Sequence, residues 1–360
     1  MSPIHVPIQV RACAAAVLAL ALTSCTLVGA DDERTTSTAP GEMPTEVVLV
    51  THESFALPKK LLRQFESDTG LTLEVRSSGD AGTVTNKLVL TKDDPTGDVA
   101  FGVDNTFASR ALDAGVFADS GVDLPTGAEG FGLDDGTDRL VPVDTGSVCV
   151  NVDTGWFAER DLTPPSSLDD LVDPAYRDLF VTPGAATSSP GLAFLLSTIA
   201  EYGDAWPDYW ADLMANGAKL TSGWSDAYYV DFTQGGGEGD RPIVLSYDSS
   251  PAFTPADDGA SSTTEALLDT CYRQVEYAGV LAGAANPEGG REVIEFLLSP
   301  EVQAALPESM YVFPVVDGID LPPDWARFAV QPDDAYAVDP AVIAAQRDDW
   351  LTTWSDVTSR

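Results

Sequence analysis

The sequence predicts an α/β fold with a largely parallel sheet. From residue 46 onward, short apolar runs alternate with amphipathic stretches, and two of the amphipathic stretches end at a glycine. Glycine is a common helix stop, and alternation of this kind is typical of strand–helix–strand units. Each helix of such a unit crosses over between two parallel strands.

The first half of the chain supplies three strand–helix pairs. The first expected helix places Leu61 and Phe65 on one face, one turn apart, and ends at Gly70. A longer run of strand character at 140–153 is expected to cross from one half of the molecule to the other. The other expected strands are 46–51, 71–77 and 98–103, and the expected helices are 57–70, 82–92 and 105–115.

The second half of the chain is less regular. The segment TSGWSDAYY at 221–229, called the aromatic segment below, has the Gly, Ser and Asp content of a loop although it carries three large aromatic rings. In the last expected helix, Trp350 and Trp354 share a stripe with Ile343, which indicates core packing. The other expected elements are a helix near 191–202, a strand at 243–247, a strand-like run at 271–281, two helices in 291–306 broken at Ser299-Pro300, and a last helix capped at Asp339-Pro340.

The N-terminus predicts export. The apolar run 12–22 is shorter than the roughly 20 residues of a membrane span and reads as the core of a signal peptide covering 1–24. It ends in LTSC, which resembles a bacterial lipobox, so Cys25 is expected to carry a lipid; an ordinary secretory signal is the alternative. The polar stretch at 25–45 is expected to be a flexible tether.

The charge of the chain excludes a nucleic-acid partner. Its 57 acidic and 19 basic residues give a formal net charge of -38, which phosphate backbones and anionic lipids repel. The acids are dispersed along the chain, as on a solvated surface. A field that attracts a cationic ligand is the alternative interpretation.

Two cysteines remain after the signal peptide and the lipid site are set aside. Cys149 and Cys271 are expected to form a disulfide outside the cytoplasm, with two buried free thiols as the alternative. The sequence has no CxxC motif and no Cys/His cluster with metal-ligand spacing, and His52 is the one histidine outside the signal peptide. No metal site is therefore predicted.

Several polar loops point to one binding cleft. The loops at 51–56, 77–82 and 246–253 follow expected strands, and open α/β sheets bind ligands at the carboxyl ends of their strands. Ser188 and Ser189 open a helix, whose free N–H groups favour anionic or polar groups. We expect these segments and the aromatic segment to line the same cleft.

Taken together, these motifs resemble the thiamine-binding proteins of bacterial ABC importers. The resemblance runs from about Val47 to Arg360 and rests, in matching order, on VTHESFA, TSSPGLAFLL, GWSDAYY, LSYDSSPAF, FLLSPEVQAALPESMYVFPV and AAQRDDWLTTW. It implies a two-lobed type II periplasmic-binding-protein fold with crossing hinge strands. The implied first lobe is 46–143 with roughly 276–315 returning to it, and the second is 144–275 with roughly 316–360 packing at the C-terminus.

The resemblance also implies the residues that hold the ligand. An aromatic wall would bind the cationic ring of thiamine, and a carboxylate would face it. Trp224 is the implied stacking platform, whereas Tyr228 and Tyr229 are expected to support it. Three positions depart from the family pattern: Tyr311 replaces a typical Trp, Phe253 a Tyr, and Glu53 a shorter Asp. The implied ligand-binding residues are Trp224, Tyr247, Asp80, Ser188, Tyr311, Glu53 and Phe253.

The function implied is capture of thiamine or its phosphates in an interlobe cleft and delivery to an ABC permease with its ATPase. Such a protein is a monomer outside the cytoplasmic membrane that uses no cofactor, since thiamine is its cargo. It touches the membrane only through its lipid anchor, and it is not an enzyme.

Two other functions compete with this one. A ferric-ion-binding protein would need a Tyr pair, which falls on Tyr247 and Asp248, so one phenolate is missing. A secreted hydrolase would need a nucleophile on a tight turn, but His52 and Ser54 are two residues apart and no GxSxG occurs.

Overall fold

The computed structural model describes residues 44–257 and 259–359. The predicted signal peptide, Cys25 and nearly all of the predicted tether lie outside this range. Within it, no helix combines the length and the apolar character that a membrane crossing requires.

The described strands form one sheet of nine, which confirms the α/β prediction. Their order is β2-β1-β3-β8-β4-β7-β5-β6, with β9 paired to β4. Pairing is parallel only at the two ends of this sheet and antiparallel around β8 and β4, so the expectation of a largely parallel sheet holds only for the ends. The strands are β1 Glu46–Thr51, β2 Thr72–Ser77, β3 Val99–Asp104, β4 Val141–Asp153, β5 Phe180–Pro183, β6 Lys219–Thr221, β7 Ile243–Tyr247, β8 Thr264–Val280 and β9 Phe313–Pro314.

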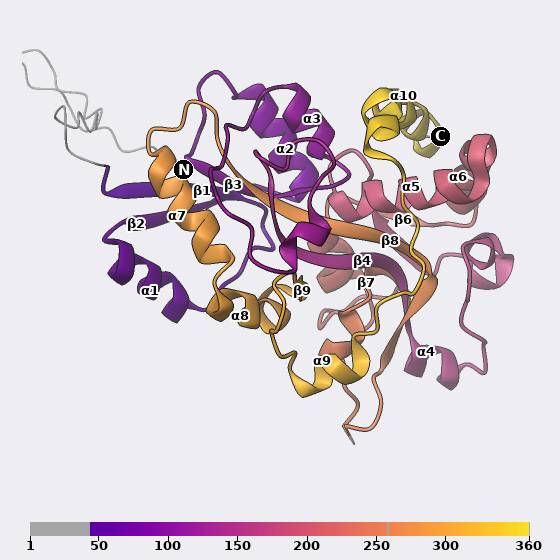
Figure 1. The fold of residues 1–360 in the computed structure, drawn as a ribbon. Helices are drawn as coiled ribbons and strands as arrows, with labels where there is room; N and C mark the ends of the chain where they lie inside the picture. Colours follow the sequence, from indigo (N-terminus) through magenta and orange to yellow (C-terminus); the bar gives the residue numbers. More distant parts are fainter. Residues whose placement is uncertain (1–43, 258, 360) are drawn as a thin grey trace, which may run out of the picture. The chain divides into compact units, whose positions relative to one another are not determined.

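Two long strands join the ends of the sheet. β4 has 13 residues and β8 has 17, and they run side by side through the middle of the molecule (Figure 1). β4 confirms the expected crossing run at 140–153. β8 begins at Thr264, well before the expected 271. Residues 264–267 have little apolar alternation, so the sequence does not predict a strand there, and they form one by backbone pairing with β4.

The pairing of β4 with β8 is interrupted near their middle. Val148 pairs with Tyr272, but Val150 pairs with Leu267, so residues 268–271 bulge out of β8. A bulge re-aims the strand and increases its twist. The two long strands therefore bend at the point where they pass from one end of the sheet to the other.

A side chain and a disulfide hold this bulge. Thr270 Oγ1 accepts the N–H of Val150 and donates to the carbonyl of Leu267, so it replaces a lost backbone pair. Cys149 and Cys271 are bonded to each other across the same place. The expected disulfide is thus present and ties the two crossing strands together.

The helices cover both faces of the sheet (Figure 1). Gly70 ends α1 with a left-handed φ of 75°, and Ser299 caps α8 after the break from α7, as the sequence predicts. The helices are α1 Lys59–Thr69, α2 Ala81–Leu90, α3 Ala108–Asp113, α4 Thr154–Glu159, α5 Ser189–Tyr202, α6 Trp206–Ala215, α7 Pro287–Leu297, α8 Pro300–Met310, α9 Pro323–Phe328 and α10 Pro340–Thr358.

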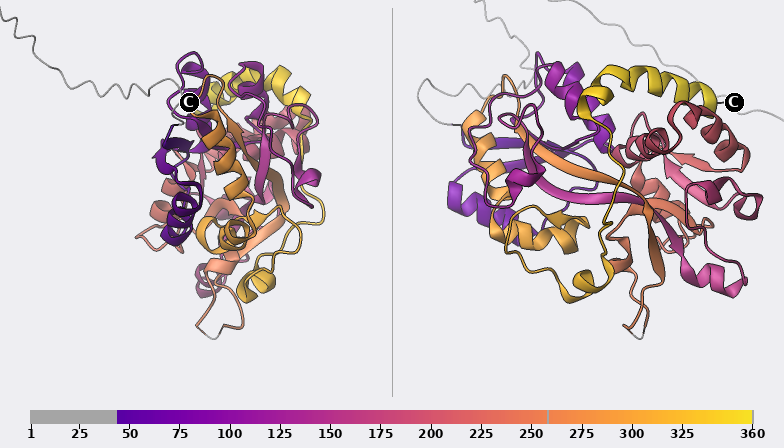
Figure 2. Two further views of the ribbon diagram at one scale, coloured as in Figure 1. Left: turned by 60° about the vertical axis from the view of Figure 1, so that its left-hand side comes forward. Right: turned by 45° about the vertical axis from the view of Figure 1, so that its right-hand side comes forward.

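The last helix touches elements from both ends of the sheet. α10 lies against α6 and also against α3 (Figure 2). Ile343 and Trp354 are buried as expected, and the ring of Trp354 meets that of Trp210 in α6 edge-on at 5.6 Å. Toward α3, the contact includes an ion pair between Arg110 and Asp348 at 4.0 Å.

The aromatic segment is not a loop, so that expectation is wrong. Helical turns begin at Trp224, and Asp226–Asp231 forms a π-helix. Trp224, Tyr228 and Phe232 are spaced four residues apart, and the ring of Tyr228 contacts the rings of the other two. They pack into a buried apolar cluster against the sheet. This packing outweighs the loop tendency of the Gly, Ser and Asp residues.

Candidate functional site

A small cavity lies where elements from both ends of the sheet meet the crossing strand β8. We call it the central cavity. Its volume is about 40 Å³, well below the roughly 300–1,000 Å³ of pockets that hold small organic ligands. Any larger ligand must therefore separate its walls to enter. It is lined by His52, Ser54, Asp80, Ala81, Ser189, Pro190, Trp224, Tyr247, Glu276, Met310, Tyr311 and Val312.

The structure brings four of the seven predicted ligand-binding residues to this cavity: Asp80, Trp224, Tyr247 and Tyr311. The other three lie outside its lining. Ser188 is fully buried and caps α5 by accepting the N–H of Gly191. Glu53 is exposed. Phe253 reaches the site indirectly, through ring contact with Tyr311.

Trp224 is both a wall of the cavity and a member of the buried aromatic cluster. Its side chain is 7% exposed, and its indole N–H donates to Ser246 Oγ at 3.0 Å. The ring stacks on Tyr228 at a centroid distance of 5.0 Å and meets Tyr247 edge-on at 6.2 Å. Tyr228 and Tyr229 lie beside it without lining the cavity. The indole is therefore held in one orientation before any ligand arrives.

Tyr311 has an unusual backbone conformation, which sets the position of its ring. It follows α8 with a left-handed φ of 66°, a region that favours glycine. Ser249 Oγ donates to its carbonyl at 2.6 Å, and its ring lies against Phe253 at 3.6 Å between centroids. A strained position of this kind persists only where the surroundings hold it, and such positions cluster at ligand sites.

Asp80 joins three elements at the cavity. Its carboxylate accepts N–H groups from Ala81 at 2.6 Å, from Trp224 at 2.9 Å and from Ser189 at 3.3 Å. Burial raises its pKa, while these hydrogen bonds act in the opposite direction. Asp80 thus ties the start of α2 to the start of α5 and to the aromatic segment, which positions the Trp224 backbone.

Sequence analysis missed a row of acids behind the cavity. In the strand register, Glu276 of β8 pairs with Asp104 of β3 on one side and with Asp144 of β4 on the other. We call these three residues the carboxyl row. All three are buried, and Glu276 lines the cavity. The signal available was an acid inside the apolar run VEYAGVL, where a core strand should carry none.

Burial changes the protonation of these groups. It raises the pKa of Asp104 to about 6, although Ser189 and Thr106 hydrogen bonds counteract it. It also raises the pKa of both Asp144 and Glu276. His52 faces Glu276 at 3.4 Å between Nε2 and Oε1, and burial lowers its pKa to about 4. At neutral pH, His52 is therefore uncharged.

These pKa values predict that stability declines with increasing pH. Burial raises the pKa of Asp104 to about 6 and that of Asp248 to about 7, so the stability that their protonated forms contribute is lost as the pH rises through those values. His52 has the opposite effect: its neutral form contributes stability to the fold, and that contribution is lost as the pH falls from 6.5 toward about 4. Because the acids with a raised pKa outnumber this one histidine, their effect on stability dominates. We expect the melting temperature to decrease from about pH 5 to about pH 9.

Thermal unfolding over this range measures the effect. Asp248 is fully buried and does not line the central cavity. Asp248→Asn should therefore flatten the curve without changing the site. A melting temperature that rises steadily from pH 5 to pH 9 would contradict the assignment.

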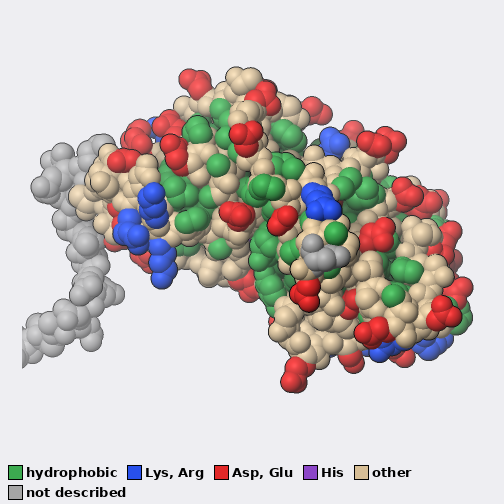
Figure 3. Space-filling view, turned by 90° about the horizontal axis from the view of Figure 1, so that it is seen from below, with side chains coloured by type: hydrophobic (Ala, Val, Ile, Leu, Met, Phe, Trp, Pro, Cys, Tyr) green, Lys and Arg blue, Asp and Glu red, His purple; other side chains and the backbone are tan. Residues whose placement is uncertain are grey.

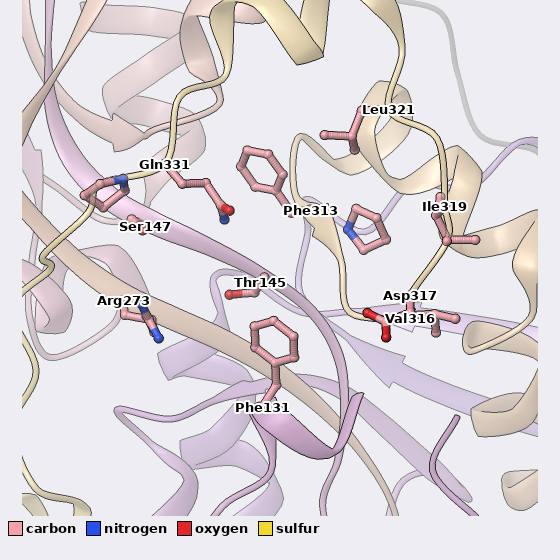
Figure 4. A pocket seen from close by; sticks show the side chains of 13 residues that line it. Phe131, Thr145, Ser147, Arg273, Phe313, Val316, Asp317, Ile319, Leu321 and Gln331 are labelled. Atoms are coloured by element: carbon pink, nitrogen blue, oxygen red, sulfur yellow. The ribbon is translucent and has the colours of Figure 1, made fainter. Parts of the chain in front are cut away.

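Larger cavities lie elsewhere and gather none of the predicted residues. One of about 420 Å³ sits beside β4 and β9 and is lined by Thr145, Ser147, Arg273 and Asp317, among others (Figure 4). Another, of about 700 Å³, is an open groove between α3 and α10. We assign the site to the smaller central cavity because aromatic rings and buried ionisable groups meet only there among these three.

The surface and the metal-binding potential complete the description. Acidic side chains are scattered over the face seen from below and form no single patch (Figure 3). Within residues 44–257 and 259–359, no group of three or more His, Cys, Asp and Glu is arranged to hold a metal ion.

Sequence comparisons find a matching family model and similar proteins. Residues 94–338 match the family model described as bacterial extracellular solute-binding protein. The thiamine-binding periplasmic protein of Escherichia coli K12 is 30% identical over 90% of this chain and 96% of its own length. That of Haemophilus influenzae is 27% identical over 78% of this chain and 80% of its own.

Solved structures give the same result. A periplasmic thiamin binding protein superposes with a TM-score of 0.77 at 30% identity and covers 89% of this chain and 100% of that one. Iron-bound HitA from Pseudomonas aeruginosa reaches a TM-score of 0.67 at 19% identity, over 87% of this chain and 99% of that one. At this low identity, the similarity to HitA is evidence for the fold only.

Proposed function

This chain belongs to the bacterial extracellular solute-binding proteins, and we propose that it captures thiamine or a thiamine phosphate in the central cavity. The expected two-lobed periplasmic-binding-protein fold agrees with the superposition on the thiamin binding protein. The observation that carries the proposal is the lining of the cavity, where Trp224, Tyr247 and Tyr311 meet the acids Asp80 and Glu276.

This lining suits a flat organic cation. The thiazolium ring of thiamine carries a permanent positive charge, and each favourable contact between a cation and an aromatic face contributes about 0.5–2 kcal/mol. Among the described residues that line the cavity there is no Lys or Arg, so the cationic ring, rather than an anionic group, is the part of the ligand that the side chains favour. The start of α5 at Ser189 also lines it, and phosphorylated forms of thiamine are included in the proposal for that reason.

The proposal extends to transport. The protein would act without catalysis and without a cofactor, as a monomer that hands its ligand to an ABC permease and its ATPase. The family and the LTSC motif support an extracytoplasmic location with a lipid on Cys25. Mass spectrometry of membrane-extracted protein tests the anchor, and a mature chain that starts elsewhere without lipid argues against it.

Iron binding receives no support from the site. Tyr247 is followed by Asp248, so the paired phenolates of a ferric site are missing. The iron-binding structural neighbour is only 19% identical, so its similarity supports the fold and not the ligand.

Calorimetric titration of the purified protein tests the function. Thiamine, its mono- and diphosphate and the neutral aminopyrimidine half of thiamine are the ligands, and Fe(III) is the comparison. We expect saturable binding of thiamine with a change in Trp fluorescence, and no colour with iron. Absence of thiamine binding by a folded protein would refute the proposal.

A further inference from the structure

The buried acids at the cavity differ in how many hydrogen-bond donors reach their carboxylate oxygens. Asp80 accepts three backbone N–H groups, and Asp104 accepts hydrogen bonds from Thr106 and Ser189. By contrast, both carboxylate oxygens of Asp144 are buried without a hydrogen-bond donor. Asp144 is fully buried, and its neighbour across the strand pairing is Glu276. An unpaired buried charge is costly, so a proton is the partner that these two carboxyl groups can share.

His52 adds a second unsatisfied group that faces the cavity. Its Nε2 lies 3.4 Å from Glu276 Oε1, yet it makes no hydrogen bond, and its side chain lines the cavity. Within the described ranges, His52 is the sole ion-pair partner within 4.0 Å of Glu276. Because burial keeps His52 uncharged at neutral pH, it does not neutralise an ionised Glu276.

The surroundings of Glu276 offer it no positive charge. Asp104 and Asp144 face it from β3 and β4, and Asp80 faces it from the cap position before α2. The Tyr247 phenol faces it from β7. Burial, followed by the nearby Asp144, Asp104 and Asp80, raises the pKa of Glu276. A cation placed in the cavity is the missing counter-charge, and its arrival favours the ionised form.

We propose that Glu276, paired with Asp144, is the anionic recognition group for the cationic ring of the ligand, and that cation binding expels the proton which the pair holds when the cavity is empty. The inference rests on the proposed function and deepens it. The balance is simple: the carboxylic acid loses H⁺ to solvent, and the permanent charge of the thiazolium replaces it. No bond to the ligand forms.

Proton release distinguishes this arrangement from ordinary packing. Thiamine is titrated at pH 7.5 in Pipes and in Aces buffer, whose ionisation enthalpies differ, so the difference in heat gives the number of protons released. We expect release to approach one proton per thiamine. The neutral aminopyrimidine half should bind with no release. Thiamine binding without proton exchange would overturn the inference while leaving the proposed function intact, whereas absence of any thiamine binding would overturn both.

Variants locate the proton. Glu276→Gln should weaken thiamine binding at least about tenfold and abolish proton release, since a charge-assisted contact is lost. Binding of the neutral aminopyrimidine should change much less. Glu265→Gln is the matched control, because Glu265 is an exposed acid on the same strand and should change neither quantity. Equal losses of affinity for the charged and the neutral ligand would show that Glu276 acts by packing and would overturn the inference.

A second variant keeps the test decisive if Glu276→Gln folds poorly. Asp144→Asn retains the shape and offers Glu276 an amide donor, so Glu276 should ionise at lower pH. Thiamine affinity at pH 6 should then rise and proton release should fall. Infrared spectroscopy of the ligand-free Asp248→Asn protein, in which that buried acid cannot contribute, should show a protonated carboxyl band at pH 7.5 that adding Asp144→Asn removes. Persistence of that band in both variants would place the proton elsewhere and refute the pairing.

Discussion

Replacing Trp224 with alanine is expected to weaken thiamine binding on the order of 30- to 1,000-fold, which corresponds to about 2–4 kcal/mol for a central aromatic anchor. The indole lines the cavity and is fixed by Ser246, Tyr228 and Tyr247, so alanine removes both the platform and its preset orientation. Calorimetric titration measures the loss.

The same substitution should also lower stability, because Trp224 belongs to a buried cluster. A large aromatic-to-alanine change in a core costs about 3–5 kcal/mol. Trp224→Phe separates the two effects: it keeps a flat ring but loses the hydrogen bond to Ser246, so affinity should fall much less. Trp156→Ala is the control, since Trp156 is half-buried and does not line the cavity, so that its loss should affect stability alone. Unchanged thiamine affinity in folded Trp224→Ala protein would leave the proposed site without its central contact.

Removing the Cys149–Cys271 disulfide is expected to destabilise the protein by about 2–5 kcal/mol. The bond closes a loop between residues 122 apart in sequence, for which the chain-entropy model gives an upper limit of about 5 kcal/mol. It also holds the bulge at which the crossing strands bend. Urea unfolding of the Cys149→Ser/Cys271→Ser protein measures the difference.

Reduction provides the internal control for this prediction. A reductant should shift the unfolding midpoint of the wild type toward that of the double variant and leave the double variant itself unchanged. Identical midpoints for the oxidised wild type and the double variant would show that the bond contributes nothing to stability. Thiamine binding by the folded double variant should persist, because neither sulfur lines the cavity.

The fold was largely predictable wherever one local pattern dominates. The run of residues 46–51 is apolar and bounded by polar residues, and it forms β1 with those bounds. The first half of β8 escaped prediction because its conformation depends on pairing with β4. In the aromatic segment and just after it, the four-residue spacing of Trp224, Tyr228 and Phe232 was visible, but the Gly, Ser and Asp residues of the segment suggested a loop instead.

The site was predictable only in part, for a related reason. Asp80, Trp224, Tyr247 and Tyr311 lie in motifs that resemble a known family, and they line the cavity. The carboxyl row carries no such motif. Glu276 becomes significant only when the strand register places it between Asp104 and Asp144, and that register links segments distant in sequence.

The position of α10 has a practical consequence for optical sensing. In the implied hinge motion the two ends of the sheet move apart to admit a ligand, and α10, which contacts both α3 and α6, can then move with only one of these helices. The ring contact between Trp354 and Trp210 favours α6, because toward α3 there is an open groove and an ion pair of 4.0 Å. A donor dye on exposed Ala344 and an acceptor on α3 would then report cavity closure by energy transfer. If the protein binds thiamine as proposed, the chain would be a scaffold for a sensor whose labels lie outside the cavity lining.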